Sequence, residues 1–406
     1  MSTPLKPSNS DEVIKAVCQA VADETPLELL GHGSKRGYGR PVQSARQLDL
    51  AALSGIMLYE PEELVLTCRA GTPIAEIEAA LEAHNQQLAF EPADLAALYG
   101  GVAGHGTIGG VLACNLSGPR RIKTGAARDH FLGFKAVSGR GEAFQAGGRV
   151  VKNVTGYDLC KLMAGSHGTL AVFTEVTIKV LPAPEKSRTI LICGLSDPAA
   201  MGAMSLALNS EHEVSGAAHL PANSAARSAV EFVSKAGGAV TALRVEGPGP
   251  SVEHRSAALR AELASLGPTE ELHTMRTALL WREIRDVAPL LPVGARDLWK
   301  LSLPPAGGAP AVAALALPSA EHYFDWSGGL VWLALPASAD AYAAAVRATV
   351  ARHGGHATLM RAPDPVRAAV PVFHPQDPAL ARLSARVKHA FDPRRILNPG
   401  RMATGL

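Results

Sequence analysis

Residues 104–118 read G-H-G-T-I-G-G-V-L-A-C-N-L-S-G, a stretch dominated by glycine and other small residues. Glycine has no side chain, so it lets a backbone turn sharply and approach a ligand closely. Successive backbone N–H groups in such a turn can point inward and surround an anion. The stretch therefore predicts either a tight turn or one wall of an anion-binding loop.

Two further glycine-rich segments lie in the same half of the chain. Residues 31–39 follow a short apolar strand predicted over residues 27–30, and Ser34 and Lys35 offer a hydroxyl and a charge to a diphosphate. The third segment runs from residues 152–158 into residues 164–170. One such loop alone is most simply a tight turn. Three loops in one region favour an extended phosphate-bearing ligand, such as a dinucleotide.

A Rossmann-type NAD site is excluded despite a matching pattern. Gly104, Gly106 and Gly109 fit G-x-G-x-x-G, and Asp129 follows twenty residues after Gly109. That fingerprint must come directly after a buried strand, and residues 94–101 do not have the pattern of one. The chain also lacks the G-x-x-x-x-G-K-[ST] pattern of nucleoside-triphosphate loops.

Composition indicates a globular protein with room for two cores. The chain has 406 residues, 47% of them hydrophobic, and a formal net charge of +2, so nucleic acid and acidic membranes are not expected partners. Its cysteines form no C-x-x-C pair, which argues against an iron–sulfur cluster or structural zinc in this chain. They are Cys18, Cys68, Cys114, Cys160 and Cys193.

The sequence predicts a cytoplasmic location. Residues 1–11 are polar and contain no apolar signal-peptide core. The most apolar stretches, near residues 307–317 and 330–345, are short or interrupted, whereas a membrane-spanning helix needs roughly 20 apolar residues. Contact with a membrane is therefore expected only through a partner.

Residues 11–182 alternate between strand patterns, helix patterns and glycine turns, and the chain after Pro184 is rich in alanine. Pro182-Ala183-Pro184 predicts a domain boundary, with domains over residues 1–184 and 185–406. Thr72 is expected to cap a helix beginning at Pro73. Further strands are expected over residues 64–68, 131–138, 142–145, 170–181 and 330–335, and helices over residues 224–235, 251–265 and 339–352.

Taken together, the glycine loops resemble the FAD-binding domain of the vanillyl-alcohol oxidase / p-cresol methylhydroxylase (PCMH-type) flavoprotein superfamily, over about residues 11–182. The resemblance implies an α+β protein. Its FAD-binding domain consists of two α/β subdomains, and an α+β cap-like C-terminal domain follows. Residues 391–401 resemble the superfamily's C-terminal strap, which returns to the FAD domain.

The resemblance also implies which residues contact FAD. In that family the first loop surrounds the diphosphate, T-I-G-G lies against diphosphate and flavin, and a strand here at residues 171–175 passes the isoalloxazine or adenine. Carried over to this sequence, the FAD-contacting residues are Gly31, His32, Gly33, Ser34, Lys35, Thr107, Ile108, Gly109, Gly110, Ala113, Cys114, Ser117 and Val172. Members with covalent FAD carry histidine where this chain has Gly33, so non-covalent FAD is expected, with His32 as the alternative tether.

Further matches resemble one branch of that superfamily, the FAD-binding subunits of glycolate oxidases. The matching segments are residues 117–121 (S-G-P-R-R), 128–130, 151–161 (V-K-N-V-T-G-Y-D-L-C-K), 296–302 (R-D-L-W-K-L-S), 325–330 (D-W-S-G-G-L) and 354–357. The branch implies a heteromeric complex with a second flavoprotein subunit and an iron–sulfur subunit, acting on a small 2-hydroxy acid such as glycolate.

Two signatures of related catalytic flavoproteins, G-H-x-G-D-G-N-x-H and a later G-E-H-G, are absent. The first hypothesis is therefore an FAD subunit that relays electrons to an iron–sulfur partner. A second is a stand-alone FAD-dependent 2-hydroxy-acid dehydrogenase that uses Arg296 or Lys300 with an unusual base. A third is a scaffold subunit that has lost FAD.

Single residues have simpler interpretations beside their functional ones. Arg296, Trp299 and Lys300 could hold a substrate carboxylate through charge-assisted hydrogen bonds, or form the solvated edge of an amphipathic strand. A local basic run either forms a solvated face or contacts phosphate or an acidic partner; it consists of Arg120, Arg121, Lys123 and Arg128. His105 and His167 are expected as surface donors, Asp158 as a helix cap, and Tyr157 in the core or near flavin.

Overall fold

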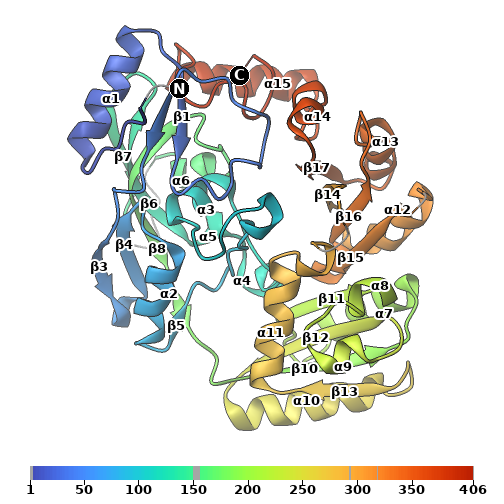
Figure 1. Cartoon of the computed structure of the whole chain (residues 1–406). Coiled ribbons are helices and arrows are strands. Elements are labelled where there is room, and N and C mark those ends of the chain that lie inside the picture. Colours follow the sequence, from blue (N-terminus) through green and yellow to red (C-terminus); the bar gives the residue numbers. More distant parts are fainter. Residues whose placement is uncertain (1–2, 150–155, 292–293, 318, 406) are drawn as a thin grey trace. The chain divides into compact units, whose positions relative to one another are not determined.

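The computed structural model describes residues 3–149, 156–291, 294–317 and 319–405. The chain forms two compact units, and each has its own sheet (Figure 1). The first unit comprises Met1–Ser117, Gly125–Ala183 and Pro371–Leu406, and the second comprises Gly118–Thr124 and Pro184–Val370. These units differ from the expected domains, 1–184 and 185–406, in the placement of residues 118–124 and 371–406. Residues 151–155 of the V-K-N-V-T-G-Y-D-L-C-K motif lie outside the described part.

A five-stranded antiparallel sheet, in the order β3-β4-β8-β6-β7, forms the centre of the first unit. Its strands are β3 (Ile56–Glu60), β4 (Val65–Arg69), β6 (Phe131–Ser138), β7 (Ala143–Gly147) and β8 (Ala171–Lys179). β8 pairs with β4 on one side and β6 on the other, and Val172, Val176 and Ile178 along it are buried. The hairpin expected from residues 131–145 is confirmed.

A separate two-stranded parallel pair delivers the first glycine loop. It consists of β1 (Leu27–Leu30) and β2 (Arg46–Asp49), and β1 runs directly into residues 31–39. Leu27 and Leu48 are fully buried, and they pack with Val13 and Val17 of helix α1 (Ser10–Ala22). This apolar packing fixes the strand, so the loop begins at a defined point.

The first unit has two long helices, α1 near its N-terminus and α15 (Pro378–Phe391) near its C-terminus. The helices between them are shorter: α2 (Ile74–Glu82), α3 (Ile108–Cys114), α5 (Ala127–His130) and α6 (Leu159–Met163). Two short strands, β5 (Gln86–Gln87) and β9 (Leu181–Pro182), pair with each other. Asp158 caps α6 as expected, accepting a hydrogen bond from the Lys161 backbone. Pro73, not Thr72, occupies the capping position of α2, because the Thr72 hydroxyl donates to the Arg69 carbonyl instead.

The C-terminal segment completes the first unit through backbone hydrogen bonds to β1. The Leu27 N–H donates to the Ile396 carbonyl at 2.7 Å, and the Asn398 N–H donates to the Leu27 carbonyl at 3.0 Å. The Asn398 side chain also accepts from the Leu29 N–H at 2.8 Å. These bonds hold residues 396–398 like a third strand beside β1, and they explain why 371–406 belong to this unit.

The second unit contains an eight-stranded antiparallel sheet in the order β13-β10-β12-β11-β15-β16-β14-β17. Its strands are β10 (Lys186–Cys193), β11 (Gly216–Leu220), β12 (Val240–Gly247), β13 (Thr269–Leu272), β14 (Arg296–Ser302), β15 (Glu321–Asp325), β16 (Leu330–Pro336) and β17 (His356–Arg361). One core cluster of this unit gathers Ile190, Leu243, Val252 and Leu259. A mixed helix-and-strand fold, as expected, is present in both units.

Two expected helices of the second unit differ from the structure. Residues 224–235 form two short helices rather than one, because the Glu283 carboxylate accepts from the Ser228 hydroxyl and the Ala229 N–H between them. The helix expected from residue 339 begins at Ala343, since Ala341 and Tyr342 adopt positive φ. The helices are α4 (Arg121–Thr124), α7 (Asp197–Leu208), α8 (Ala222–Ala225), α9 (Glu231–Ser234), α10 (Gly249–Leu263), α11 (Thr274–Arg285), α12 (Gly308–Leu315), α13 (Ala343–Arg352) and α14 (Asp364–Ala369).

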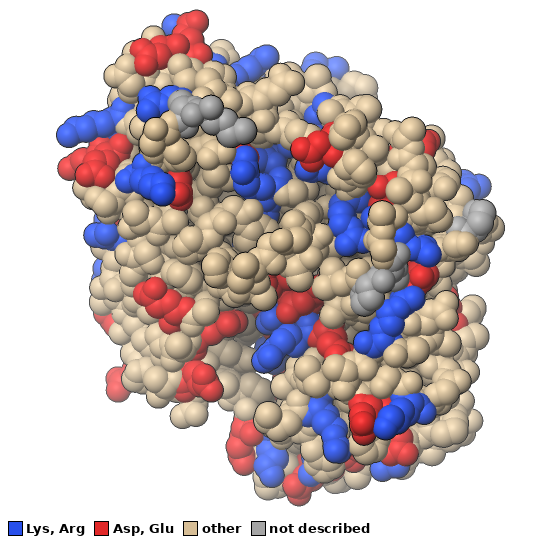
Figure 2. Space-filling view, viewed as in Figure 1, with Lys and Arg blue, Asp and Glu red and all other residues tan. Residues whose placement is uncertain are grey.

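Charged side chains of both signs are interspersed on the face shown in Figure 2, in keeping with the net charge of +2. In the described part of the chain, no helix combines the length and the apolar character needed to cross a membrane. Over the same residues, no group of three or more His, Cys, Asp or Glu side chains is arranged to hold a metal ion.

Candidate functional site

An open cavity lies in the first unit, where the three glycine-rich segments and the C-terminal segment converge. Its wall is formed by the end of β1 and the loop after it (residues 29–36), by the loop and first turns of α3, by the start of β8, and by Asn398 and Arg401. The folding of β1, α3 and β8 thus gathers segments separated by more than a hundred residues into one site.

Most of the residues predicted to contact FAD line this cavity. They are Gly31, His32, Gly33, Ser34, Lys35, Thr107, Gly109, Gly110, Ala113, Cys114 and Val172. Ile108 and Ser117 do not. Ile108 is fully buried beneath the loop, and the Ser117 hydroxyl accepts from the Ala127 N–H at 2.9 Å. Both therefore support the loop from behind rather than facing the cavity.

Glycine is required where these loops meet. A Cβ atom added to Gly31 would lie 2.5 Å from the Thr107 hydroxyl oxygen, and one added to Gly109 would lie 2.7 Å from the Ala70 carbonyl oxygen. Gly33 has a φ of +74°, a conformation that residues with side chains rarely adopt. The first and second loops thus lie in direct contact at Gly31 and Thr107, whereas the Gly109 N–H already donates to the Ala70 carbonyl at 2.9 Å.

Lys35 supplies positive charge in the cavity wall. Its ammonium donates to the Ser34 hydroxyl at 3.1 Å. Burial lowers the pKa of Lys35, and the nearby Cys114 and Asp94 oppose that shift only partly. A partly desolvated ammonium whose hydrogen-bond partner is a neutral hydroxyl is stabilised by an added anion. A Cβ atom added to Gly106 or to Gly110 would lie 3.4 or 3.5 Å from the Lys35 Nζ, so the charge faces the glycine loop.

His167 is also in the wall, although the sequence predicts a surface donor. It is 8% exposed, its Nδ1 lies 3.6 Å from the Cys114 sulfur, and it stacks against Tyr38 and Phe373 with ring centroids 4.8 Å away in each case. Burial, assisted by Arg401, lowers the pKa of His167 to about 3. Burial likewise raises the pKa of the Cys114 thiol to about 11. Both groups are therefore neutral near pH 7.

A buried carboxylate joins the loop to the C-terminal segment. Glu28 is 5% exposed and accepts two hydrogen bonds from the Arg36 guanidinium, at 3.0 and 2.7 Å. Arg401 approaches the same carboxylate at 3.3 Å and donates to the Arg36 carbonyl at 2.9 Å. Charge-assisted bonds of this kind hold both segments in one geometry around the cavity.

The sequence analysis missed Tyr38, His167, Asn398 and Arg401 as wall residues. Tyr38 and His167 lie in the glycine-rich segments 31–39 and 164–170, and Asn398 and Arg401 lie in the expected strap, so the sequence analysis identified the segment of each residue but not its place in the wall. Tyr157 is 94% exposed, so it lies neither in the core nor in the cavity wall.

The second unit holds the other predicted charges. Trp299 is fully buried and donates to the Ala341 carbonyl at 2.9 Å, and Arg296 pairs with Glu321 at 3.4 Å. Trp299 is thus a core residue, and Arg296 is ion-paired rather than solvated. Lys300 lies beside Trp326, with its ammonium 5.2 Å from the indole centroid.

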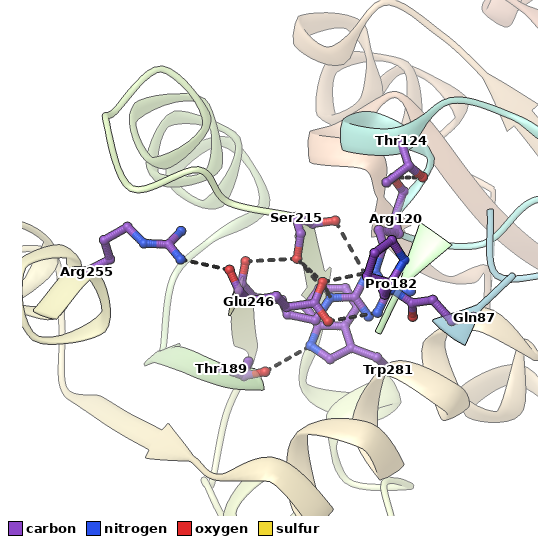
Figure 3. Close-up of polar contacts among 10 residues, drawn as sticks. Gln87, Arg120, Thr124, Pro182, Thr189, Ser215, Glu246, Arg255 and Trp281 are labelled. Carbon is purple, nitrogen blue, oxygen red and sulfur yellow. Dashed lines mark hydrogen bonds and ion pairs between the residues drawn. The ribbon is translucent and has the colours of Figure 1, made fainter. Parts of the chain in front are cut away.

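The basic run of residues 120–128 does not form one surface. Arg120 donates to Glu246 in the second unit at 2.9 and 2.7 Å, where Ser215 also contacts Glu246 (Figure 3). Lys123 pairs with Glu213 at 3.3 Å. Arg128 belongs to the first unit and lies 3.9 Å from Asp129.

The cavity fits FAD by its chemistry. It combines a cationic, glycine-walled part for a diphosphate with an apolar part formed by Ala171, Val172 and Phe173, against which an aromatic ring can lie. When bound there, FAD accepts electrons from a substrate, and the protein contributes position and electrostatics.

Comparison with known proteins supports the same cofactor. A model of the FAD binding domain family matches residues 4–147. Glycolate oxidase subunit GlcE of Escherichia coli (strain K12) is 34% identical over 394 residues, covering 97% of this chain and 97% of that protein. D-lactate dehydrogenase of Archaeoglobus fulgidus is 32% identical over 179 residues, but these cover 44% of this chain and 38% of that protein.

Solved structures of low sequence identity share the fold. 4-ethylphenol oxidase from Gulosibacter chungangensis superposes with a TM-score of 0.73 at 15% identity, covering 98% of this chain and 88% of that one. p-Cresol methylhydroxylase gives a TM-score of 0.69 at 13% identity, with the same coverage. Since the identity to GlcE extends over both whole proteins, the chain belongs to the family of FAD-linked oxidoreductases that includes glycolate oxidase subunit GlcE, and its cofactor is FAD.

Proposed function

We propose that this chain is the FAD-carrying subunit of a multi-subunit oxidase of glycolate or a similar small 2-hydroxy acid. The cavity of the first unit, with its glycine walls and Lys35, carries the proposal, and the full-length similarity to GlcE supports the choice of substrate. FAD is held non-covalently, and the protein acts in the cytoplasm, with any membrane contact through a partner subunit.

The residues around the cavity bind and orient FAD. The backbone N–H groups of the loop that begins at Gly31, together with the Lys35 ammonium, receive the diphosphate. The side chain of Val172 lies along a ring face. His167 and Cys114 are neutral and hydrogen-bonded within the wall, so they shape the cavity without adding charge.

The cavity offers little for removing a proton from an alcohol. None of the described residues that line it is an aspartate or a glutamate, and the low pKa of His167 makes its imidazole a weak base. We therefore propose that a second flavoprotein subunit oxidises the substrate, and that this chain passes electrons onward to an iron–sulfur partner subunit.

The test is an absorbance spectrum of the purified chain, followed by anaerobic addition of glycolate. Flavin bands that are released by denaturation, and that bleach with glycolate only after the partner subunits are added, support the relay. Bleaching by the chain alone contradicts the relay and favours a stand-alone dehydrogenase. A chain that takes up no FAD contradicts the whole proposal and leaves a scaffold role.

A further inference from the structure

One ring nitrogen of His167 has no partner in the described part of the chain, although its side chain is largely buried in the cavity wall. The residue is 8% exposed and lines the cavity. Its Nδ1 lies 3.6 Å from the Cys114 sulfur. Its Nε2 forms no hydrogen bond with any described residue and keeps some solvent exposure. Because buried polar groups are normally hydrogen-bonded, Nε2 marks a position for an atom of a ligand in the cavity.

Contacts through both backbone and ring hold His167 in place. Its N–H donates to the Ala113 carbonyl at 2.8 Å, and its carbonyl accepts from the Asn398 side chain at 2.8 Å. The ring contacts Tyr38 edge to face and also contacts Phe373, with centroids 4.8 Å from each. Its φ of +53° is a left-handed conformation, which non-glycine residues keep mainly where surrounding structure enforces it, often at functional sites. The imidazole is therefore already ordered before a ligand binds.

The Cys114 thiol decides which ring nitrogen of His167 carries the proton. Burial raises the pKa of the Cys114 thiol to about 11 and, assisted by Arg401, lowers the pKa of His167 to about 3, so both groups are neutral near pH 7. A thiol sulfur is a weak acceptor, whereas an unprotonated imidazole nitrogen accepts readily. The Cys114 S–H therefore donates to Nδ1, and the imidazole proton is left on Nε2.

The charges around this pair of residues favour an anion at Nε2. Lys35 and Arg401 line the same cavity, and both act to lower the pKa of Cys114 against the larger effect of burial. Among the described residues that line the cavity there is no aspartate or glutamate. An N–H group near two cations is best matched by a negatively charged acceptor, and the diphosphate is the charged part of FAD.

We propose that His167 donates a hydrogen bond from Nε2 to the diphosphate of bound FAD, and that Cys114 positions this donor by holding Nδ1. His167 is then the cofactor contact, and Cys114 is a positioning residue that acts through it. The sequence analysis gave the opposite roles, with Cys114 as an FAD contact and His167 as a surface donor. The inference rests on the FAD site of the proposed function, but neither on the substrate nor on the electron relay.

The experiment is a double-mutant cycle on FAD affinity. Cofactor-free full-length protein is titrated with FAD, and flavin fluorescence gives the dissociation constants. His167→Phe keeps an aromatic ring but removes both nitrogens, and the dissociation constant is expected to rise about tenfold, as for loss of a hydrogen bond to a charged group. His167→Gln keeps an N–H donor and is expected to recover part of the affinity.

Cys114→Ala tests the positioning role. It is expected to weaken FAD binding in the otherwise unchanged protein and to have no further effect in the His167→Phe background, because Cys114 acts through His167. Cys18→Ala removes an exposed thiol of α1 and is the matched control, with normal FAD binding expected.

A second measurement needs no FAD. In protein with isotopically labelled histidine ring nitrogens, magnetic resonance shifts show which nitrogen carries the proton, and the His167 signals are those lost in His167→Phe. The proton is expected on Nε2 near pH 7, and Cys114→Ala is expected to move part of it to Nδ1. A proton on Nδ1 in the unchanged protein overturns the role of Cys114.

Normal FAD affinity in His167→Phe, with its unfolding temperature preserved, overturns the hydrogen bond and leaves the proposed function standing. Additive losses in the double variant mean that Cys114 contacts FAD itself. Adenosine diphosphate that binds His167→Phe as well as the unchanged protein, while FAD binds more weakly, overturns the assignment to the diphosphate. A chain whose flavin bleaches with glycolate alone contradicts the electron relay and leaves this inference standing.

Discussion

Lys35 is the residue through which the first glycine loop contributes charge. Its ammonium is partly desolvated, donates to the neutral Ser34 hydroxyl, and faces positions 106 and 110 of the second loop. Burying part of the ammonium lowers the stability of the cofactor-free protein slightly, and a bound anion offsets this desolvation cost. Lys35 is therefore expected to affect cofactor binding more than folding.

Replacing Lys35 with methionine is expected to weaken FAD binding about tenfold or more, because a charge-assisted hydrogen bond to the diphosphate is worth roughly 1.5–3 kcal/mol. Titration of the cofactor-free protein with FAD, followed by flavin fluorescence, gives the dissociation constants. Lys15→Met, at an exposed position of α1, is the matched control and should bind FAD normally. Equal affinity in both variants would show that the diphosphate does not lie at Lys35.

Substitution of Gly31 tests whether the first glycine loop must lie directly against Thr107 of the second loop. Gly31→Ala places a methyl group 2.5 Å from the Thr107 hydroxyl oxygen, so one loop must move. We expect loss of FAD binding and a destabilisation of about 1–3 kcal/mol, the usual range for overpacking. Gly202→Ala is the control: it lies on α7 with open space around it, and should stabilise by roughly 0.5–1 kcal/mol. Chemical denaturation and FAD titration of both variants supply the comparison; a normal Gly31→Ala protein would refute the requirement.

At the scale of elements, α15 is joined to the first unit by a buried ion pair at its end. The Lys388 ammonium donates to Asp392 at 2.7 Å, to the Thr169 carbonyl at 2.6 Å and to the Leu397 carbonyl at 3.0 Å. Asp392 in turn accepts from the Ile396 and Leu397 N–H groups. The pair thus connects the helix, the loop before β8 and the segment that contacts β1.

Lys388→Met removes one partner and leaves the Asp392 carboxylate buried without its counter-charge. Removing one member of a buried pair typically costs about 3–5 kcal/mol. We expect the free energy of unfolding of the first unit to fall by that amount, with weaker FAD binding because Asn398 and Arg401 follow in the same segment. Denaturant unfolding checks this against Arg386→Gln, an exposed change on the same helix. A loss no larger than in that control would mean the pair is dispensable.

At the scale of the whole molecule, the second unit recruits a segment from within the sequence of the first. Residues 118–124 belong to it because Arg120 meets Glu246, and because Ile122 packs on its core. Burial alone would raise the pKa of Glu246, but Arg244 and Arg120 lower it from 4.5 to about 2. The ion pairs of Arg120 and Arg244 in this unit therefore involve an ionised Glu246 carboxylate.

This carboxylate predicts how stability depends on pH. Its folded pKa is lower than its unfolded value, so the ion pair stabilises the second unit fully above pH 4.5 and is lost as pH falls from 4.5 toward 2. Glu246→Gln should lower the unfolding temperature at pH 7, by the equivalent of about 3 kcal/mol, and the difference from the wild type should shrink across that window. Calorimetric scans at several pH values measure it.

Glu253→Gln is the matched control for that series. Glu253 pairs with Arg188 at 3.1 Å but is 54% exposed, so its loss should cost at most about 1 kcal/mol. A Glu246→Gln deficit that persists undiminished below pH 3 would contradict the ionised state of Glu246.

The sequence by itself determined what depends on neighbouring residues. The strand before residue 31, the hairpin of residues 131–145, the Asp158 cap and the glycine loops follow from local conformational preference, since glycine, alternating apolar residues and short polar side chains act within a few positions. Eleven of the 23 residues that line the cavity were predicted as FAD contacts, because they occur in contiguous motifs.

Only the tertiary structure decided which distant segments meet. His167 and Arg401 entered the cavity wall, and residues 118–124 joined the second unit, through contacts between residues far apart in the chain. A distant contact also interrupts the helix expected at residues 224–235, because the Glu283 carboxylate accepts a hydrogen bond from the Ala229 N–H. No local preference encodes these partners, because a buried charge or ring is stabilised by whatever the completed fold places against it.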